Sequence, residues 1–369
     1  MPHIRSGRWL VVARRSSKRG TIQEVARLAG VSPATVSRVL NNHPRTSPET
    51  RRRVLDAVAQ LGYVPDHTAR SLKTGNVGEI ALAVPDIGNP VYVAIAKAVH
   101  EVAARRGWWL SLISTEGSQT EELRALRALA GNRIDGLIIT SLTVSQAFLR
   151  ALEPVQGRVV VIGRVPDETP VDNVRVESEV GAKLAVEHLI DLGCQRIGFI
   201  NGVQGTVPST SRIEGYRLGL ASRGMEYDPK LVVESDFTIM GGYEAIDRLL
   251  EQAPDLDGVF AANDAMAIGV LRRLRERGIR VPHDVAVIGM DDIDLCRIAT
   301  PTLSTVTLLA AERGRIAGEL LLDRIEGRAQ GEWQRVTVLP RLIVRESTSL
   351  LRVERVGPPH QDPNVGRQG

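Results

Sequence analysis

Residues 21–41 read TIQEVARLAGVSPATVSRVLN, and this stretch decides the fold of the amino-terminal part of the chain. Thr21 and Glu24 have the spacing of a capping box, in which the first side chain caps a helix and the second reaches back to its backbone. Apolar residues then recur at helical spacing as far as a glycine, which is typical of a helix end. Ser32 and Pro33 suit the N-cap and the first position of a following helix. The stretch therefore predicts two short helices joined by a tight turn.

A third helix is predicted from Ser47 and Pro48 to Gly62, where the same signals for a helix start and a helix end recur. Two short helices joined by a glycine-containing turn make a helix-turn-helix, whose second helix enters the major groove of DNA. The apolar side of that helix is needed for the core, so its other side chains are candidates for DNA contact, and Arg38 can bond guanine through two nitrogens. The candidate DNA-binding residues of this region are Thr21, Ser32, Ala34, Thr35, Ser37, Arg38 and Asn41. On the pattern alone, a three-helix bundle with no role at DNA is the alternative.

The charge of the chain is distributed unevenly. Residues 1–76 hold fourteen Lys or Arg against four Asp or Glu, whereas the remainder holds 33 against 39. A basic head on an acidic body indicates a polyanionic partner for the head, although a solvated basic face would carry the same charge. The chain has no apolar run of the ~18 residues that a transmembrane helix needs, its apolar stretch at 9–13 is too short for a signal peptide, and its two cysteines make no disulfide framework. We therefore expect a cytoplasmic protein with no membrane partner.

The remainder of the chain, from 78 to about 352, alternates β-rich runs with amphipathic helical runs. Strands are predicted at 79–84, 109–113, 136–140, 159–162, 196–200, 258–262 and 285–288. Helices are predicted between them, at 91–106, 121–130, 182–192, 212–223 and 266–277. This alternation predicts parallel sheets covered by helices. The length suits two subdomains, with late segments near 303–309 and 335–343 crossing back between them.

The run 21–41 resembles the headpiece of the LacI/GalR family of bacterial transcription regulators, and the match extends through 47–51 and 61–65. The later part resembles the effector domain of that family, which is related to periplasmic sugar-binding proteins, at 84–90, 134–138, 186–189, 262–267 and 287–292. The resemblance covers about residues 21–350. It implies an all-α helix-turn-helix headpiece followed by a two-subdomain, periplasmic-binding-protein-like α/β domain with parallel sheets.

The resemblance also implies a division of the chain. We expect a disordered basic extension at 1–20, the headpiece at 21–63, a hinge at 64–77, an effector-binding and dimerisation domain at 78–352 and a flexible tail at 353–369. The effector domain would divide into about 78–176 with 308–336, and 177–307 with 337–352. Because residues 1–20 precede the usual start of the family, they are either a flexible arm that adds phosphate contacts or an artefact of the chosen start codon.

The expected hinge has few apolar residues and reads as a linker. It resembles the hinge of the family, in which the Ala-Arg-Ser-Leu of residues 69–72 recurs and becomes helical on specific DNA. The resemblance implies that Leu72 wedges into the minor groove at the operator centre and kinks the duplex. Without it, an exposed linker leucine with no such role is the simpler interpretation. A segment that folds on binding spends interaction energy on ordering, so it can be switched.

Polar residues follow several of the predicted strands, where doubly wound sheets bind their ligands. Matched to the family, Arg212, Asn263 and Asp291 are implied to bind the effector, because a guanidinium and a carboxylate hold sugar hydroxyls in fixed geometry. For each of them the alternative is an N-cap or a structural ion pair, as it is for the neighbouring Asp264 and Asp292. The complete set of implied effector-binding residues is Asn89, Tyr92, Arg212, Phe237, Asn263 and Asp291.

Two departures from the family pattern leave the identity of the effector undetermined. The loop 205–211 before Arg212 has no second basic residue, and Glu177 stands near a position where many members carry aspartate. The sequence therefore predicts a sugar or sugar derivative as effector without naming it.

These observations predict a sequence-specific DNA-binding transcription regulator, a repressor that binds a palindromic double-stranded operator under the control of a small molecule. One helix-turn-helix reads a few base pairs, so a homodimer is expected, and the tail after residue 352 lacks the leucine heptads of a tetrameric coiled coil. A secreted sugar-binding protein would share the fold of the body but lack the helix-turn-helix. A non-specific nucleoid protein would ignore both DNA sequence and ligand.

Enzymatic activity is not expected from this sequence. Residues 202–206 lack the G-x-G-x-x-G spacing of a dinucleotide-binding loop. The seven histidines do not have metal-ligand spacing. We therefore predict no catalytic residue, no metal and no cofactor.

Overall fold

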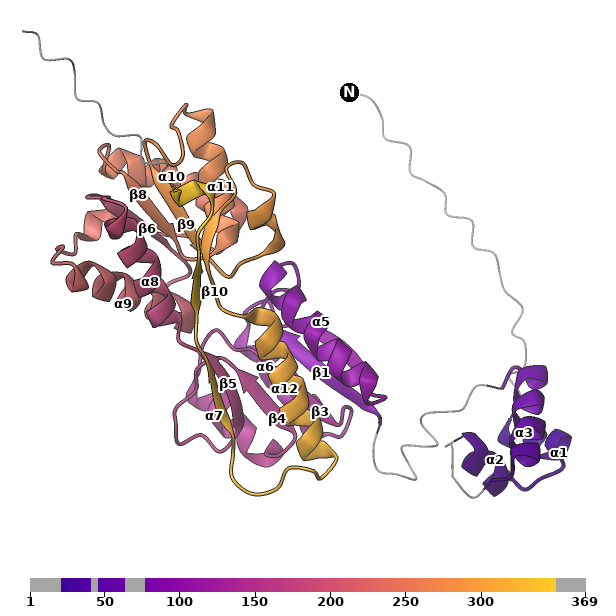
Figure 1. The fold of residues 1–369 in the computed structure, drawn as a ribbon. Coiled ribbons are helices and arrows are strands. Elements are labelled where there is room, and N and C mark those ends of the chain that lie inside the picture. The colour runs from indigo at the N-terminus through magenta and orange to yellow at the C-terminus, as the bar shows by residue number, and fades with distance from the viewer. Residues whose placement is uncertain (1–20, 41–45, 64–76, 350–369) are drawn as a thin grey trace, which may run out of the picture. The chain divides into compact units, whose positions relative to one another are not determined.

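A computed structural model describes residues 21–40, 46–63 and 77–349 (Figure 1). The chain divides into two compact units, Met1–Gly75 and Asn76–Gly369. Several predictions fall outside the described residues, namely those for the extension 1–20, for Asn41, for the tail 353–369, and for most of the hinge, including Leu72.

The first unit contains the three predicted helices, α1 (Ile22–Ala29), α2 (Pro33–Leu40) and α3 (Pro48–Leu61). The capping box is confirmed, because the Glu24 N–H donates to Thr21 Oγ1 at 3.3 Å and the Thr21 N–H donates to the Glu24 carboxylate at 2.7 Å. Gly30 and Gly62 end α1 and α3 in the left-handed conformation, at φ of 64° and 56°. The buried core shared by the helices consists of Val25, Ala26, Ala29, Val36, Val39, Val54 and Ala57.

The second unit contains two sheets, of which the first has the strand order β11-β5-β4-β3-β1-β2 with every neighbouring pair parallel. Its strands are β1 (Glu79–Val84), β2 (Trp109–Ser114), β3 (Gly136–Ile139), β4 (Val159–Ile162), β5 (Asp172–Val176) and β11 (Arg335–Val338). One face packs on α5 (Pro90–Arg105) and α12 (Ala310–Ile325), which lie side by side (Figure 1). The other face packs on α6 (Gln119–Ala130) and α7 (Gln146–Leu152), after which comes the short η1 (Glu153–Val155).

The second sheet has the order β12-β10-β9-β8-β6-β7, and its neighbouring pairs are parallel except for β10 with β12. Its strands are β6 (Ile197–Asn201), β7 (Val232–Glu234), β8 (Gly258–Ala261), β9 (Ala286–Met290), β10 (Ser304–Thr307) and β12 (Arg341–Ile343). Its helices are α8 (Ser178–Asp191), α9 (Val207–Ser222), α10 (Ile239–Gln252) and α11 (Asp264–Glu276), with the short η2 (Pro229–Leu231), η3 (Asp294–Arg297) and η4 (Glu346–Thr348). The predicted fold class, a helical headpiece with a two-sheet α/β domain, is confirmed.

Within residues 77–349 the chain passes between the sheets three times, after β5, after β10 and after β11. The last passage follows Val338, so the boundary expected between 336 and 337 falls inside β11. Helix α9 begins at Val207 instead of the expected Arg212, because Thr206 caps it by accepting the Ser209 N–H at 3.4 Å. The sequence also did not predict β5, β7, α7, α10 and α12. The strands β5 and β7 and the helix α7 are short, whereas α10 and α12 have apolar residues at helical spacing that were not assigned to helices.

A buried ion pair fastens α12 to the first sheet. Asp172 on β5 is fully buried and accepts hydrogen bonds from Arg324 Nε at 2.7 Å and Nη2 at 3.0 Å. The same carboxylate accepts the backbone N–H of Gln334 at 2.7 Å, which brings β11 beside β5. One side chain therefore fixes the helix and the strand that return from the second sheet.

We predict that Asp172→Ala lowers the free energy of unfolding of the second unit by about 3–5 kcal/mol, because it leaves the buried Arg324 guanidinium without its carboxylate counter-ion. Urea denaturation followed by circular dichroism measures this loss. Asp167→Ala is the matched control, since Asp167 is 81% exposed in its ion pair with Arg175, and it should change the denaturation midpoint little. Equal losses in the two variants would contradict the anchoring role.

Candidate functional site

Helix α2 of the first unit has a buried side and an accessible side. Val36 and Val39 are buried against α1 and α3. Ser32 caps the helix as predicted, because its hydroxyl oxygen accepts the Thr35 N–H at 3.1 Å. The accessible or half-buried candidates on this helix and at its start are Ser32, Ala34, Thr35, Ser37 and Arg38. They form a polar surface of the kind that a helix presents to DNA bases.

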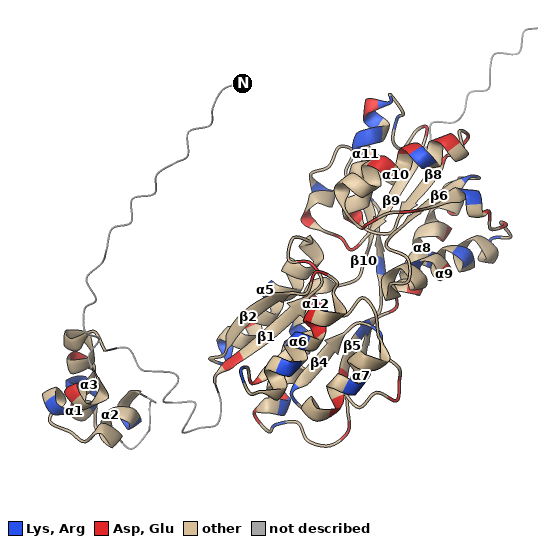
Figure 2. Cartoon of the chain, turned by 180° about the vertical axis from the view of Figure 1, so that it is seen from behind, with Lys and Arg blue, Asp and Glu red and all other residues tan. Residues whose placement is uncertain are grey.

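All three helices of the first unit carry arginine, namely Arg27 on α1, Arg38 on α2 and residues 51–53 on α3. Figure 2 colours Lys and Arg blue on these helices. Thr21 is exposed at the start of α1, with its hydroxyl engaged in the capping box. The described part of the first unit thus carries both the base-reading candidates and the positive charge that attracts a phosphate backbone.

The second unit contains a cavity of about 630 Å³ lined from both sheets. Residues after β1, β3 and β4 of the first sheet and after β6, β7, β8 and β9 of the second contribute to its wall. In a parallel sheet the following helix begins where a strand ends, so the first turns of α5, α9, α11 and α12 also border the cavity. Unpaired N–H groups at helix starts favour acceptor or negatively charged groups on a ligand.

The cavity brings together the residues that the sequence comparison with the family singled out. Asn89 and Tyr92 come from α5 of the first sheet, and the others come from elements of the second sheet. The lining includes the complete set Asn89, Tyr92, Arg212, Phe237, Asn263 and Asp291.

Arg212 and Asp291 form a buried ion pair in the cavity wall, with Nη2 and Oδ1 3.7 Å apart and side chains 8% and 7% exposed. This separation is too long for a hydrogen bond, so both groups keep bonding capacity for a ligand. Burial raises the pKa of Asp291, and the Arg212 and Arg313 guanidinium groups act in the opposite direction. The Arg212 guanidinium also lies 5.8 Å from the ring centre of Phe237.

Phe237 has an unusual backbone, with a φ of 68°. Its ring packs against Gly202, where an added Cβ would lie 1.9 Å from the ring. Asn263 supports the same turn, because its Nδ2 donates to the Phe237 carbonyl at 2.9 Å while its Oδ1 caps α11 by accepting the Met266 N–H at 2.9 Å. Asn263 therefore has the capping role that the sequence allowed, and it also lines the cavity.

On the first sheet, Asn89 caps α5 by accepting the Val91 N–H at 3.1 Å. Tyr92 stands one turn further along. Burial and the Asp291 carboxylate raise the pKa of Tyr92 to about 12, so its hydroxyl stays protonated at neutral pH and can donate to a ligand. These two residues form the part of the wall that faces the second sheet's polar groups.

Arg313, a cavity residue of α12 that is 8% exposed, was not among the residues expected from the sequence. Desolvation by burial lowers the pKa of Arg313, while Asp291 and Tyr92 raise it. A signal for this position exists in the sequence. Arg313 interrupts a stripe of small and apolar residues at helical spacing that is formed by Ala310, Gly314, Ala317 and Leu321.

Asp264 lies behind the cavity and holds the turn that presents Asp291. Its carboxylate accepts the Thr305 hydroxyl at 2.6 Å and the Ile293 N–H at 3.1 Å. Asp292, the other acid with an open role, accepts from Arg345 Nη2 at 2.6 Å. Complete burial and the charge of Asp291 raise the pKa of Asp264 to about 7. Asp264 and Asp292 thus have structural roles beside the cavity.

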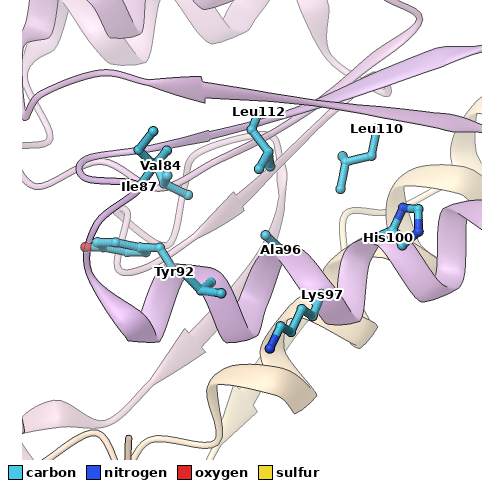
Figure 3. A pocket seen from close by; sticks show the side chains of 9 residues that line it. Val84, Ile87, Tyr92, Ala96, Lys97, His100, Leu110 and Leu112 are labelled. Carbon is cyan, nitrogen blue, oxygen red and sulfur yellow. The ribbon is translucent and has the colours of Figure 1, made fainter.

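A second hollow, of about 300 Å³, lies between α5 and β2 (Figure 3). Figure 3 shows Leu110 and Leu112 on the strand side, Ala96 on the helix side, and the Tyr92 ring at one end with its oxygen directed away from His100. Its other lining residues are Val84, Ile87, Val93 and Lys97. Two of these apolar side chains are largely exposed, Ile87 at 56% and Leu112 at 54%.

Across residues 21–40, 46–63 and 77–349, no helix combines the length and the apolar character that a bilayer crossing requires. The same residues contain no group of three or more His, Cys, Asp or Glu placed to hold a metal ion.

A helix-turn-helix joined to a two-sheet α/β domain with a polar cavity defines a class of protein, the transcription regulators with a periplasmic-binding-protein-like domain. The sequence profile described as "Bacterial regulatory proteins, lacI family" matches residues 21–66, and that of the "Periplasmic binding protein-like domain" matches residues 186–348. The chain is 39% identical over 338 residues to the HTH-type transcriptional regulator CelR of Thermobifida fusca, which covers 89% of this chain and 98% of the relative.

Solved structures agree with this relationship. A complex of the transcriptional regulator CelR with cellobiose is 38% identical, covers 89% of this chain and 100% of that chain, and has a TM-score of 0.68. A lac repressor dimer bound to operator and the anti-inducer ONPF is 28% identical, covers 90% and 99% of the two chains, and has a TM-score of 0.79. The chain therefore belongs to the lacI family of bacterial regulatory proteins, as residues 21–41 predicted, and it is a DNA-binding transcription regulator controlled by a small molecule.

We predict that Asp264→Asn gains stability relative to the wild type as the pH rises from about 4 to about 7. The pKa of this carboxyl is about 7 in the folded protein and about 4 when unfolded, so the unfolded chain releases the proton first and the wild type loses stability through that window. Asparagine does not ionise and is spared this loss.

Thermal unfolding midpoints of the wild type and Asp264→Asn from pH 4.5 to 8 measure the effect. Thr305→Val keeps the carboxyl and removes a hydroxyl donor that lowers the pKa of Asp264, so this variant should lose at least as much stability as the wild type when the pH rises. A difference between wild type and Asp264→Asn that stays constant over the whole range would show that the carboxyl does not titrate there.

Proposed function

We propose that this regulator is a repressor that binds a palindromic operator as a homodimer and is controlled by a carbohydrate or carbohydrate derivative in the cavity. The observation that carries the proposal is the gathering of Arg212, Asp291, Phe237 and Tyr92 in one cavity of a chain whose first unit is a helix-turn-helix. The cytoplasm, where bacterial DNA lies, is the proposed compartment. No catalytic role, metal or cofactor is part of the proposal.

DNA reading is assigned to the accessible side of α2. Arg38 is exposed there and would bond guanine O6 and N7, while Ala34 offers a methyl group for contact with thymine. Ser32, Thr35, Ser37 and Thr21 would bond phosphate oxygens or base edges. Asn41 and the minor-groove wedge at Leu72 complete the proposed contacts and stay predictions from the sequence.

The homodimer follows from the size of the reading element, because one short helix contacts too few base pairs to specify an operator. The apolar hollow between α5 and β2 supports it, since exposed apolar patches of this kind mark protein interfaces. The operator-bound dimer of the lac repressor supports the same arrangement by relationship.

The cavity suits a polyhydroxylated ligand. Asp291 would accept from sugar hydroxyls, Arg212 would donate to sugar oxygens, and the Phe237 ring would cover an apolar face of the sugar. The cellobiose complex of a related regulator supports a carbohydrate as the class of ligand.

Control would arise because the ligand contacts both sheets at once. Tyr92 and Asn89 lie at the start of α5, beside the first sheet. Arg212 on α9 and Asp291 after β9 lie beside the second sheet. A bound ligand that contacts both sets therefore favours one relative arrangement of the two sheets. A typical coupling free energy of about 1–3 kcal/mol between ligand and DNA would change operator affinity about 5- to 150-fold. Linkage requires DNA to change the affinity for the ligand by the same factor.

We predict that Arg38→Ala weakens binding to the best operator by about 1–3 kcal/mol and relaxes the preference at one base position in each half-site. Selection of operators from random DNA with both proteins, followed by fluorescence anisotropy at physiological salt, measures both effects. The selected wild-type site should be a palindrome, as a homodimer requires. A uniform loss of affinity for all DNA sequences would assign Arg38 to phosphate contact instead.

We predict that Arg212→Met reduces affinity for the effector by about tenfold or more, because charge-assisted hydrogen bonds contribute about 1.5–3 kcal/mol each. Operator binding without ligand should persist, since Arg212 lies outside the first unit. The readout is operator release by members of a sugar panel that includes cellobiose.

Arg217→Met is the matched control for that experiment, because Arg217 is on the same helix, 48% exposed, and paired with Glu214 at 3.7 Å. It should respond to ligand as the wild type does. A full ligand response in Arg212→Met would move the effector site away from this cavity.

A further inference from the structure

The buried wall of the cavity carries more positive than negative side chains. Arg212, Arg313 and Asp291 line it and are 7%, 8% and 8% exposed, respectively. Arg212 and Asp291 compensate each other in part, at 3.7 Å. Among the described residues the guanidinium of Arg313 has neither a hydrogen-bond partner nor an ion pair, and the Nε atoms of both arginines are without partners. Burying an unpaired cation is strongly unfavourable, so this arrangement calls for a partner from outside the chain.

Arg313 is held rigidly in this position. It lies in the first turn of α12, and its neighbour Gly314 packs so closely on α5 that an added Cβ would lie 2.6 Å from the Ile95 carbonyl oxygen. At the other end of α12, the Arg324–Asp172 ion pair fastens the helix to the first sheet. The backbone of Arg313 is therefore held at the cavity wall.

The other acids of the cavity do not neutralise Arg313. The carboxylates of Asp86, Glu116 and Asp236 belong to the exposed rim, where they are balanced in part by the exposed Arg164. Asp86 accepts the Gly88 N–H at 2.7 Å and Asp236 accepts the Thr238 N–H at 2.9 Å, so both serve their own turns. The wall between the two arginines is thus suited to negative charge.

We infer that Arg313 is an effector-binding residue and that, with Arg212, it holds an anionic group, a carboxylate or a phosphate ester, on a sugar-sized effector. This inference rests on the proposed function of the cavity and names the ligand class more narrowly. Guanidinium groups bind such anions through two parallel hydrogen bonds. Because Arg313 is on α12, which packs on the first sheet, and Arg212 is on α9 beside the second, the anion would connect the two halves of this unit.

The test compares the full chain with three single variants, Arg313→Met, Arg313→Lys and Arg315→Met. Arg315 is two residues further along the same helix, 46% exposed, and paired with Glu319 at 2.9 Å, so its variant is the matched control. Thermal unfolding without ligand should show a higher midpoint for Arg313→Met than for the wild type, because an unpaired buried charge is removed. Arg315→Met should not show that increase, and a lower midpoint for Arg313→Met would overturn the inference.

The ligand arm uses pairs of probes that differ by one acidic group, namely D-glucose with D-glucuronate, D-ribose with ribose 5-phosphate, and cellobiose with cellobionate. Calorimetric titration at constant ionic strength should show, for at least one pair, about tenfold or greater preference of the wild type for the acid. Arg313→Met should lose this preference, Arg313→Lys should retain part of it, and Arg315→Met should keep it. Equal binding of acid and neutral members, no binding of any acid, or a preference that persists in Arg313→Met would overturn the inference.

Operator release in the same samples separates this inference from the proposed function. A neutral sugar that releases DNA equally from the wild type and Arg313→Met would leave the carbohydrate-controlled repressor in place and remove the anion site. Absence of any preferred operator in the wild type would instead overturn the proposed function.

Discussion

The structure of the second unit depends on one constraint, which is that charges buried between two sheets must find partners. Arg212 and Asp291 meet this constraint in part through each other, at a distance that leaves their remaining bonding capacity open. Arg313 does not meet it within the described chain. A cavity wall of this kind is less stable empty than an apolar wall would be, and it becomes favourable when a polar ligand supplies the missing bonds. The same groups that cost stability therefore give the cavity its affinity and selectivity.

Parallel topology explains why these groups converge. Apart from β12, neighbouring strands in both sheets are parallel, and the loops after several strands deliver polar residues, in most cases with the start of a helix, to the same cavity. Close helix packing then fixes the side chains. The helix of Arg212 approaches α8 so closely that a Cβ at Gly215 would lie 2.1 Å from the Glu179 carbonyl oxygen. Rigid helices make the cavity sensitive to the relative position of the two sheets, as control by a ligand requires.

The two units divide the work of the regulator. The first unit has a small core and an accessible, polar α2, which suits it to reading base edges rather than to binding a small molecule. The second unit has the larger core and the cavity. Asp291 has a strained backbone with a φ of 120°, and Asp264 stabilises its turn by accepting the Ile293 N–H. The buried Asp264, with its own hydrogen-bond partners, thus supports the position of a cavity residue.

The sequence by itself determined the headpiece and the class of the second unit. The ends of a helix depend on contacts within a few residues, so they can be predicted from the sequence, as at the starts Thr21 and Ser47 and the ends Gly30 and Gly62. Most strands of the second unit are apolar runs, and such runs can also be recognised in the sequence. Their order, however, was not predicted, and neither was β5, because Asp172 and Asn173 read as polar until Arg324 and the β4 backbone supply their hydrogen bonds.

Tertiary structure alone decided what Arg313 does. In the sequence it stands between Glu312 and Gly314, where it interrupts an apolar stripe, but the stripe does not say which cavity the residue lines. Packing of α12 on α5 turns it away from solvent and into a cavity whose opposite wall, with Arg212 and Asp291, comes from the other sheet. Local signals encode helices because the hydrogen bonds of a helix are local. A binding cavity is made by residues that are distant in the chain, and only the packing of the sheets and helices brings them within reach of one ligand.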